Sequence, residues 1–90
     1  MPVEVRIPTI LRTYTDDQKA VEARGESLSA LIDDLEAHHP GIKDRLIENG
    51  DLRRFVNVYV SGEDIRFQQG LETAINEGDE VTILPAVAGG

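Results

Sequence analysis

Ser27-Leu28-Ser29-Ala30-Leu31-Ile32-Asp33-Asp34-Leu35-Glu36 is the clearest amphipathic helix in this chain of 90 residues. Its leucine and isoleucine residues recur at positions i, i+3, i+4 and i+7, which places them on one face, and its acidic residues occupy the other face. Ser27 is a good N-cap, because its hydroxyl can accept a hydrogen bond from an N–H group of the first turn. Pro40-Gly41 ends the helix. The sequence therefore predicts one long helix with an apolar face to bury.

Two strands are predicted before this helix. Val3, Val5 and Ile7 alternate with charged residues, which is typical of a half-buried strand, and this strand ends at Pro8. Residues 9–17 are turn-forming and polar, so they are predicted to form a loop. The alternation resumes over residues 18–23, and the two strands are expected to pair as a hairpin.

After the helix, a short helix and a strong strand are predicted. Residues 42–47 indicate the short helix, which leads to a turn at residues 49–51. Residues 55–60 give the strongest strand signal in the chain, with three valines on one face and Phe55 and Tyr59 on the other.

The final third of the chain is predicted to consist of short elements and one last strand. A turn over residues 61–64 is followed by a short strand over 65–67 and a single helical turn over 71–76. The last strand covers residues 80–85, and its inward-facing residues are expected to be Val81 and Ile83.

This order of elements predicts an α+β fold in which the helix packs across one face of a mixed sheet of four to five strands. The apolar face of the helix then meets the inward valines and isoleucines, and the first and last strands lie side by side at the centre. That layout is a ubiquitin-like β-grasp. The length suits one domain, so residues 1–90 are expected to form a single domain with a flexible tail at residues 86–90.

The composition argues against several classes of function. A net charge of −8 disfavours nucleic acid and anionic membranes as partners, because both attract clustered lysine and arginine. The absence of cysteine excludes disulfides, thiolate nucleophiles and cysteine-bound metals. The N-terminus does not resemble a signal peptide, and no apolar run approaches the roughly 20 residues of a membrane span. A cytoplasmic protein is therefore expected.

The five residues after the last strand, Ala86-Val87-Ala88-Gly89-Gly90, are small or apolar and carry no side-chain charge. An extended segment of this length reaches roughly 16 Å, which is enough to enter the active site of another protein. The glycines lack a Cβ atom, so the backbone can pass through a narrow channel. The terminal carboxylate of Gly90 is ionised at neutral pH and is a poor electrophile. Acyl chemistry there needs activation, most simply by ATP to an acyl-adenylate.

Residues 70–90 resemble the C-terminal end of the ThiS/MoaD family of sulfur carriers. The combination that carries the resemblance is Gly78-Asp79-Glu80-Val81 followed by Pro85-Ala86-Val87-Ala88-Gly89-Gly90. Residues 3–12 and 54–60 look closer to the CysO branch of this family, which is found in actinobacteria. The resemblance covers nearly the whole chain.

This resemblance implies a protein co-substrate and not an enzyme, with no cofactor or metal of its own. A ubiquitin-activating-like adenylyltransferase and sulfurtransferase adenylates the Gly90 carboxylate with ATP and Mg, and a sulfur donor then converts it to a thiocarboxylate. The thiocarboxylate gives its sulfur to a biosynthetic enzyme. In CysO-like members this enzyme is an O-phosphoserine-using synthase of cysteine synthesis, and a metalloprotease releases the product. Other branches serve molybdopterin, thiazole or sulfur-containing secondary metabolites.

Apolar residues near the tail are candidates for binding a partner. Leu84 is expected to point away from the helix, and it matches the position of an interface hydrophobe in the family. Phe55 and Tyr59 are outward on the neighbouring strand, and Pro85 lies next to the tail. An apolar group beside a reactive tail could form a docking patch, although single apolar residues on a sheet surface are also ordinary.

Other polar residues are predicted to be structural or solvated. His38 and His39 are adjacent on the helix and point about 100° apart, so they cannot easily share a metal ion. The pair Asp33-Asp34 is predicted to lie on a solvated helix face. The pair Arg53-Arg54 is predicted to lie on the surface, with the docking of an acidic partner as the alternative.

Two alternatives to a sulfur carrier stay open on the residues alone. One is a ubiquitin-like modifier that is joined through Gly90 to lysines of target proteins, because the same activated tail would serve. The other is a non-reactive β-grasp interaction module whose tail is incidental. An enzyme in its own right is disfavoured, since the sequence has no cysteine and no convergent set of acidic and basic groups.

Overall fold

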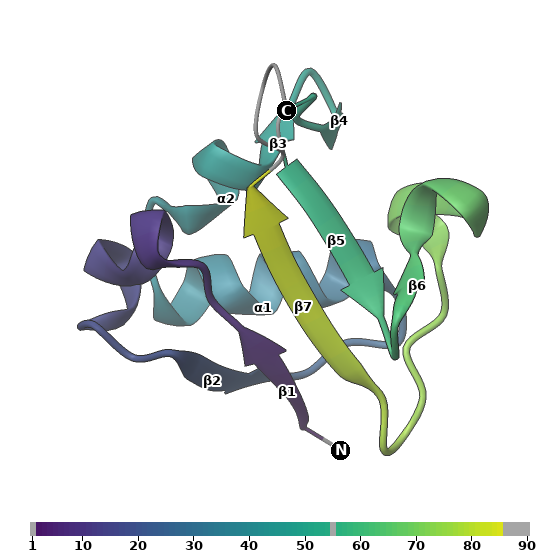
Figure 1. Cartoon of the computed structure of the whole chain (residues 1–90), viewed down its shortest axis with the longest axis horizontal. Coiled ribbons are helices and arrows are strands. Elements are labelled where there is room, and N and C mark those ends of the chain that lie inside the picture. Colours follow the sequence, from purple (N-terminus) through teal and green to yellow (C-terminus); the bar gives the residue numbers. More distant parts are fainter. Residues whose placement is uncertain (1, 55, 86–90) are drawn as a thin grey trace.

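The computed structural model describes residues 2–54 and 56–85, and it contains a five-stranded mixed sheet with the main helix on one face (Figure 1). Its strands are β1 Val3–Arg6, β2 Ala20–Ala23, β5 Val56–Val60, β6 Glu63–Asp64 and β7 Glu80–Pro85. The strand order is β2-β1-β7-β5-β6, in which β1 and β7 are parallel and the other neighbours antiparallel. This is the predicted ubiquitin-like β-grasp, with the first and last strands adjacent.

Shorter elements surround this sheet. The turn predicted at residues 49–51 joins two short strands that form a second, two-stranded sheet, which the sequence pattern did not indicate. No helix in the described residues is both long and apolar enough to cross a lipid bilayer. The elements are α1 Leu28–His38, α2 Ile42–Leu46, β3 Ile47–Glu48, β4 Asp51–Leu52 and the 3-10 helices η1 Thr9–Thr15, η2 Ile65–Phe67 and η3 Gly70–Glu72.

Helix α1 buries one face against the sheet, as its spacing predicts. Its four apolar core residues are each exposed by 2% or less, and they share one core with the inward residues of the central strands. Ser27 caps the helix, because its Oγ accepts a hydrogen bond from the N–H of Ala30 at 3.2 Å. Full burial of each such side chain contributes roughly 1.5–3 kcal/mol, so this contact supplies much of the stability. The inward residues of the central strands are Val3, Val5, Val56, Val58, Val60, Val81 and Ile83.

Residues 9–17 are not the predicted loop, because most of them form the 3-10 helix η1. Leu11 and Thr15 lie four positions apart, and both are buried. The Oγ1 of Thr15 donates a hydrogen bond to the carbonyl of Gln18 at 3.0 Å. The segment is mostly polar and therefore looks like a loop in the sequence. Thr15 is nevertheless buried, because its hydroxyl is hydrogen-bonded.

The strand predicted over residues 65–67 is wrong. The returning strand is β6, which pairs with β5 directly across a two-residue turn formed by Ser61 and Gly62, with φ angles of 49° and 86°. Asp64 then accepts a hydrogen bond from the N–H of Arg66 at 2.9 Å and begins η2 in place of a strand. The helical turn predicted over residues 71–76 is the shorter η3.

Gly25 lies where the chain passes from β2 into α1, in close contact with the helix backbone. A Cβ atom at this position would lie 2.7 Å from the Cα of Leu31 and 2.8 Å from the carbonyl carbon of Ala30. Backbone atoms inside a packed helix cannot move aside as a flexible side chain can. The close approach of chain and helix therefore requires glycine.

Gly25→Ala is expected to lower the free energy of unfolding by about 3 kcal/mol, because overpacking against backbone forces the helix away from the strand. Chemical denaturation measures this loss. Gly50→Ala is the matched control, since a Cβ there meets nothing within 4 Å and only the positive φ of 79° opposes it. We expect the control to lose about 1 kcal/mol. Equal losses in the two variants would contradict the close contact at Gly25.

Glu36 fixes the junction between α1 and α2. Its carboxylate accepts hydrogen bonds from the N–H of Gly41 at 3.0 Å and from the N–H of Lys43 at 2.9 Å. The bond from Gly41, and then the bond from Lys43, lower the pKa of Glu36 below its ordinary value of 4.5. The carboxylate therefore stabilises the folded state in its ionised form.

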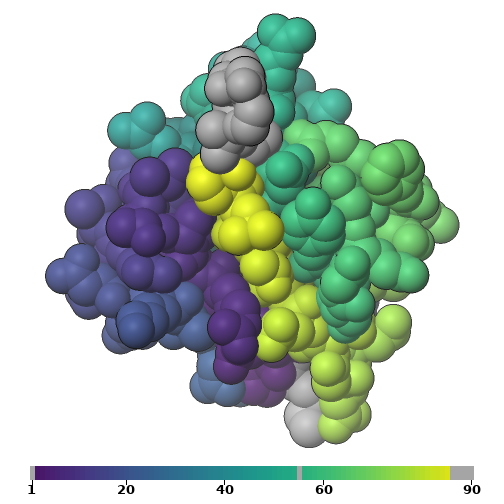
Figure 2. Space-filling view, viewed as in Figure 1, coloured from purple at the N-terminus to yellow at the C-terminus, as the bar shows by residue number. Residues whose placement is uncertain are grey.

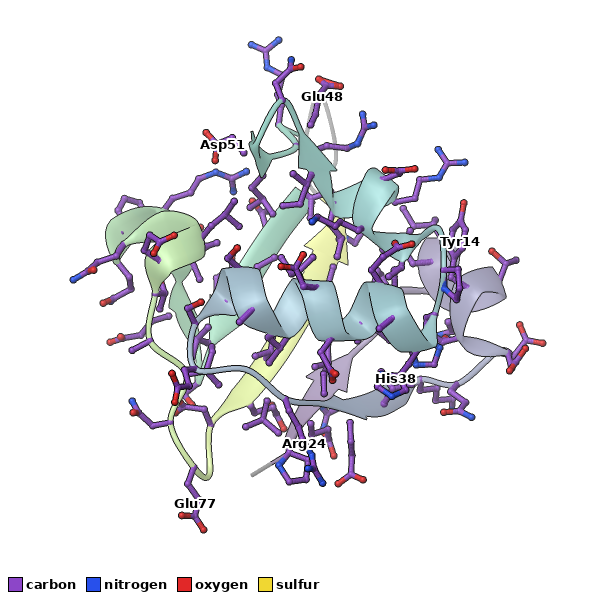
Figure 3. The ribbon with its side chains drawn as sticks, turned by 180° about the vertical axis from the view of Figure 1, so that it is seen from behind. Tyr14, Arg24, His38, Glu48, Asp51 and Glu77 are labelled. Carbon is purple, nitrogen blue, oxygen red and sulfur yellow. The ribbon has the colours of Figure 1, made fainter. Side chains whose placement is uncertain are left out.

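Glu36→Gln is expected to lower the free energy of unfolding at neutral pH. In acid, the difference in this free energy between the variant and the wild type should become smaller. Because the pKa is lowered by folding, the stabilisation is present above 4.5 and is lost as the pH falls through the folded-state value. Urea unfolding at about pH 7 and about pH 3 measures the difference. Glu77→Gln, in an exposed loop (Figure 3), is the control. If the free energy of unfolding differed between the wild type and Glu36→Gln by the same amount at both pH values, this role of Glu36 would be refuted.

Candidate functional site

The end of β7 is where the predicted tail leaves the domain. β1 pairs with β7 only as far as Thr82, whereas β5 continues to pair with it through Leu84 and Pro85. The last residues of β7 therefore extend beyond the end of β1, with β5 as their one strand neighbour among the described residues (Figure 1). Residues 86–90, which the sequence singles out, lie outside the described residues.

Arg66 holds the part of β5 that supports this strand end. Its guanidinium donates to the carbonyl of Val56 at 2.7 Å, to the carbonyl of Arg53 at 3.2 Å and to the Oδ1 of Asn57 at 2.6 Å. Val56 and Asn57 are the register partners of the last two residues of β7. The guanidinium thus fixes the entry into β5 from outside the sheet. This role cannot be predicted from the sequence, because the pattern around Arg66 indicates a strand.

The opposite end of β7 is fixed by Asp79. Its carboxylate accepts hydrogen bonds from the Oγ of Ser61 at 2.8 Å and from the N–H of Asn76 at 2.7 Å. The Oγ of Ser61 also accepts a hydrogen bond from the N–H of Glu80 at 3.3 Å. The start of β7 is therefore held directly by side chains, whereas its end is supported through β5, whose first residues Arg66 binds.

Two of the predicted partner-binding residues, Tyr59 and Leu84, lie on the sheet face opposite α1, whereas Pro85 follows the alternation of the inward Val81 and Ile83 at the strand end. Leu84 is 44% exposed, Pro85 is exposed and Tyr59 is half-buried. Tyr59 pairs with Thr82, so Tyr59 and Leu84 are diagonal neighbours on the face that Figure 2 presents. Phe55 is outside the described residues. The structure places two of the four candidates on one face and exposes Pro85 at the adjoining strand end, and the role of all four in binding stays a prediction.

Ile10 is an exposed apolar residue that the sequence analysis did not include in this surface. It is 68% exposed on η1, and it lines two hollows together with Leu84 and Pro85. Its position could not be anticipated, because the segment was predicted as a loop. The position of η1 beside the end of β7 is set by the tertiary fold, and no local sequence pattern predicts it.

The histidines and acidic residues of α1 have structural roles. His38, labelled in Figure 3, lies with its Nδ1 2.9 Å from the carbonyl oxygen of Asp34 at the C-terminal end of the helix. Asp33 forms an exposed salt bridge with Lys43 at 2.6 Å. Within residues 2–54 and 56–85, no three histidine or acidic side chains are grouped so that they could hold a metal ion.

Residues 5–90 match the family model described as the ThiS family. The chain is 59% identical to the sulfur carrier protein CysO of Mycobacterium tuberculosis, over the full length of both chains. It is 40% identical to small archaeal modifier protein 3 of Haloferax volcanii, again over the full length of both. Its structure is similar to a chain of the Amycolatopsis orientalis BexX/CysO complex, with a TM-score of 0.93 and 57% identity over 98% of this chain and 99% of that one.

Replacing Arg66 by methionine is expected to loosen the strand end from which the tail departs. The variant loses charge-assisted hydrogen bonds to two carbonyls, so we expect a loss of about 1–2 kcal/mol in stability. Amide hydrogen exchange should accelerate at the paired ends of β5 and β7 more than at β1. Arg6→Met is the control, because its salt bridges to Glu4 and Glu80 are exposed and contribute less. If the amides of Asn57 and Leu84 were as well protected from exchange in Arg66→Met as in the wild type, this role of Arg66 would be overturned.

Proposed function

Because the chain belongs to the ThiS family and is a sulfur carrier, not an enzyme, we propose that it carries sulfur on the carboxyl group of Gly90. A ubiquitin-activating-like adenylyltransferase forms an acyl-adenylate from this carboxylate and ATP with Mg, and pyrophosphate leaves. A sulfur donor then displaces AMP and leaves a thiocarboxylate. The ATP and the metal belong to the partner.

Family membership is the observation that carries this proposal, since the match extends through Gly90. The anchoring of β7 supports it in physical terms. A reactive group at the end of a short tail is delivered accurately only if the base of the tail is fixed. Asp79 fixes the turn that begins β7, and Arg66 fixes the start of β5, the strand that pairs with the end of β7.

The acceptor in this proposal is a biosynthetic enzyme of cysteine synthesis, as for CysO-like carriers. The full-length identity of 59% with the mycobacterial sulfur carrier protein CysO supports this branch. An O-phosphoserine-using synthase would receive the sulfur, and a metalloprotease would release the product. The process would take place in the cytoplasm. The similarity to a chain of the BexX/CysO complex makes sharing with a second sulfur-requiring pathway part of the same proposal.

A second candidate function is conjugation of Gly90 to lysines of target proteins. The 40% identity with small archaeal modifier protein 3 favours it, because that relative is named as a protein modifier. Both functions begin with the same adenylate. They differ in the nucleophile that takes the acyl group, which is a sulfur species in one case and a lysine amine in the other.

Incubation with the activating enzyme of the same organism, ATP and sulfide is expected to replace one oxygen of Gly90 by sulfur. Intact-mass spectrometry measures the replacement, and fragmentation places it at the C-terminus. A chain that lacks Gly90 should remain unloaded, because the preceding residue does not reach the adenylating site in the same register. Covalent adducts on lysines with no free thiocarboxylate would favour the modifier. Sulfur loading that persists without Gly90 would reject the proposed attachment site.

A further inference from the structure

The two-residue turn between β3 and β4 is formed by Asn49 and Gly50, and both residues are exposed. Their φ angles of 54° and 79° are positive, as a type I′ hairpin turn requires. Of the three asparagines in the chain, Asn49 alone precedes a glycine. A Cβ atom built on Gly50 would meet no atom of the described residues within 4 Å, so this side of the turn faces open space.

The pair of turn residues combines an electrophile with a nucleophile. The side-chain amide carbon Cγ of Asn49 is an acyl group, and the backbone nitrogen of Gly50 can close a five-membered ring on it. Glycine has no side chain that would shield this nitrogen. Because Gly50 lies in the turn, outside the register pairs of β3 and β4, the ladder of the hairpin does not use its N–H.

Ring closure requires the hairpin to open. The nitrogen of Gly50 reaches Cγ only after rotation about the Cα–C bond of Asn49, whose backbone the turn holds in the left-handed conformation. The hairpin is a separate sheet with two register pairs, and a two-stranded hairpin of this kind is marginally stable in water. Arg53 adds support, because it donates to the carbonyl of Asp44 at 2.8 Å and to the Oε1 of Glu48 at 2.9 Å.

The other two asparagines lack this combination of features. Asn57 lies in the longer strand β5 and precedes a branched valine, and its Oδ1 accepts a hydrogen bond from Arg66 at 2.6 Å. Asn76 precedes a glutamate, and its own N–H donates to the Oδ2 of Asp79 at 2.7 Å. Both residues are therefore internal references for the reactivity of Asn49.

We propose that Asn49 is a site of spontaneous deamidation, which proceeds through a succinimide when the β3–β4 hairpin opens. The nitrogen of Gly50 forms a bond to the Cγ of Asn49 and gives up its proton, while the amide C–N bond breaks and ammonia leaves with that proton. Water then opens the ring at either carbonyl and leaves aspartate or isoaspartate. In sum, one water is consumed and one ammonia is released. This inference does not rest on the proposed function.

Deamidation changes both the charge and the length of the hairpin. A new carboxylate appears between Glu48 and Asp51, which flank the turn in Figure 3, and like charges repel. Isoaspartate also inserts a methylene into the main chain, so the two-residue turn no longer matches the register of the strands. The N–H of Arg53, which donates to the carbonyl of Leu46 at 2.8 Å, should therefore exchange faster in the modified chain.

Incubation of the purified full chain in mildly alkaline buffer, followed by peptide mapping in acid, tests the site. We expect the peptide with residue 49 to gain the mass that replacement of NH2 by OH adds, and part of the product to be isoaspartate. Conversion at Asn49 should be at least about ten-fold faster than at Asn57 or Asn76. Asn49→Gln should block it, because a larger ring would have to form. Equal rates at the three asparagines, or aspartate without isoaspartate, would contradict the proposal.

Two further measurements test the opening of the hairpin. The native chain is expected to react about ten-fold to 100-fold more slowly than the chain unfolded in urea, because a local opening suffices. A ratio as large as the equilibrium constant for global unfolding would reject this route.

Arg53→Met should accelerate the reaction of the native chain about five-fold, because its lost hydrogen bonds favour the open hairpin. Arg24→Met, on another surface (Figure 3), is the matched control and should react like the wild type. Circular dichroism and urea unfolding check that both variants are folded. An unchanged rate in Arg53→Met, or equal acceleration in Arg24→Met, would overturn the role of the hairpin.

Discussion

The parallel pairing of β1 and β7 is the constraint on which the rest of the structure depends. Parallel neighbours cannot be joined by a tight turn, and here the whole chain between Arg6 and Glu80 forms the connection. That connection must place α1 over the sheet, because the inward residues of the central strands need an apolar cover. The pairing also brings the two halves of the chain together, and it requires contacts that are distant in sequence.

The same constraint places the functional end of the molecule. β7 has β1 on one side and β5 on the other for most of its length, but only β5 supports its last residues. The proposed carrier chemistry needs a tail that can leave the domain and a base that does not move. The hydrogen bonds of Arg66 to the start of β5 meet the second need where the sheet no longer provides a neighbour on both sides. The strand end, the hollows beside it and the base of the tail are therefore one local structure.

The sequence predicts the parts of this fold that repeat a simple pattern. The spacing of the leucines in α1 and the alternation in β7 identify both elements, because each has one buried face. Prediction from the sequence pattern fails where burial depends on hydrogen bonds or on turn geometry. Thr15 is a polar residue in the interior, and the tight turn at Ser61 makes the next strand begin earlier than the apolar residues suggest.

The candidate site divides in the same way. Leu84 can be found from the sequence, since alternation places it on the outer face, and the tail is recognised from its motif. The hollows beside the end of β7 cannot be found in this way. Their lining residues are spread from Arg6 to Pro85, and no local pattern connects them until η1, α2 and β5 meet around that strand end. The comparisons with known proteins confirm the family, and they leave the roles of individual residues as predictions.

The parallel pair has a practical consequence for handling the protein. Glu4 lies beside Glu80 at the start of β7, so the N-terminal residues of β1 are at the opposite end of that strand from Pro85 (Figure 1). A purification tag, a fluorophore or a surface linker attached ahead of Pro2 therefore points away from the working end. Immobilisation through that side presents every molecule to an enzyme in solution in the same orientation. The parallel pairing of β1 and β7 therefore also makes the chain convenient to tether.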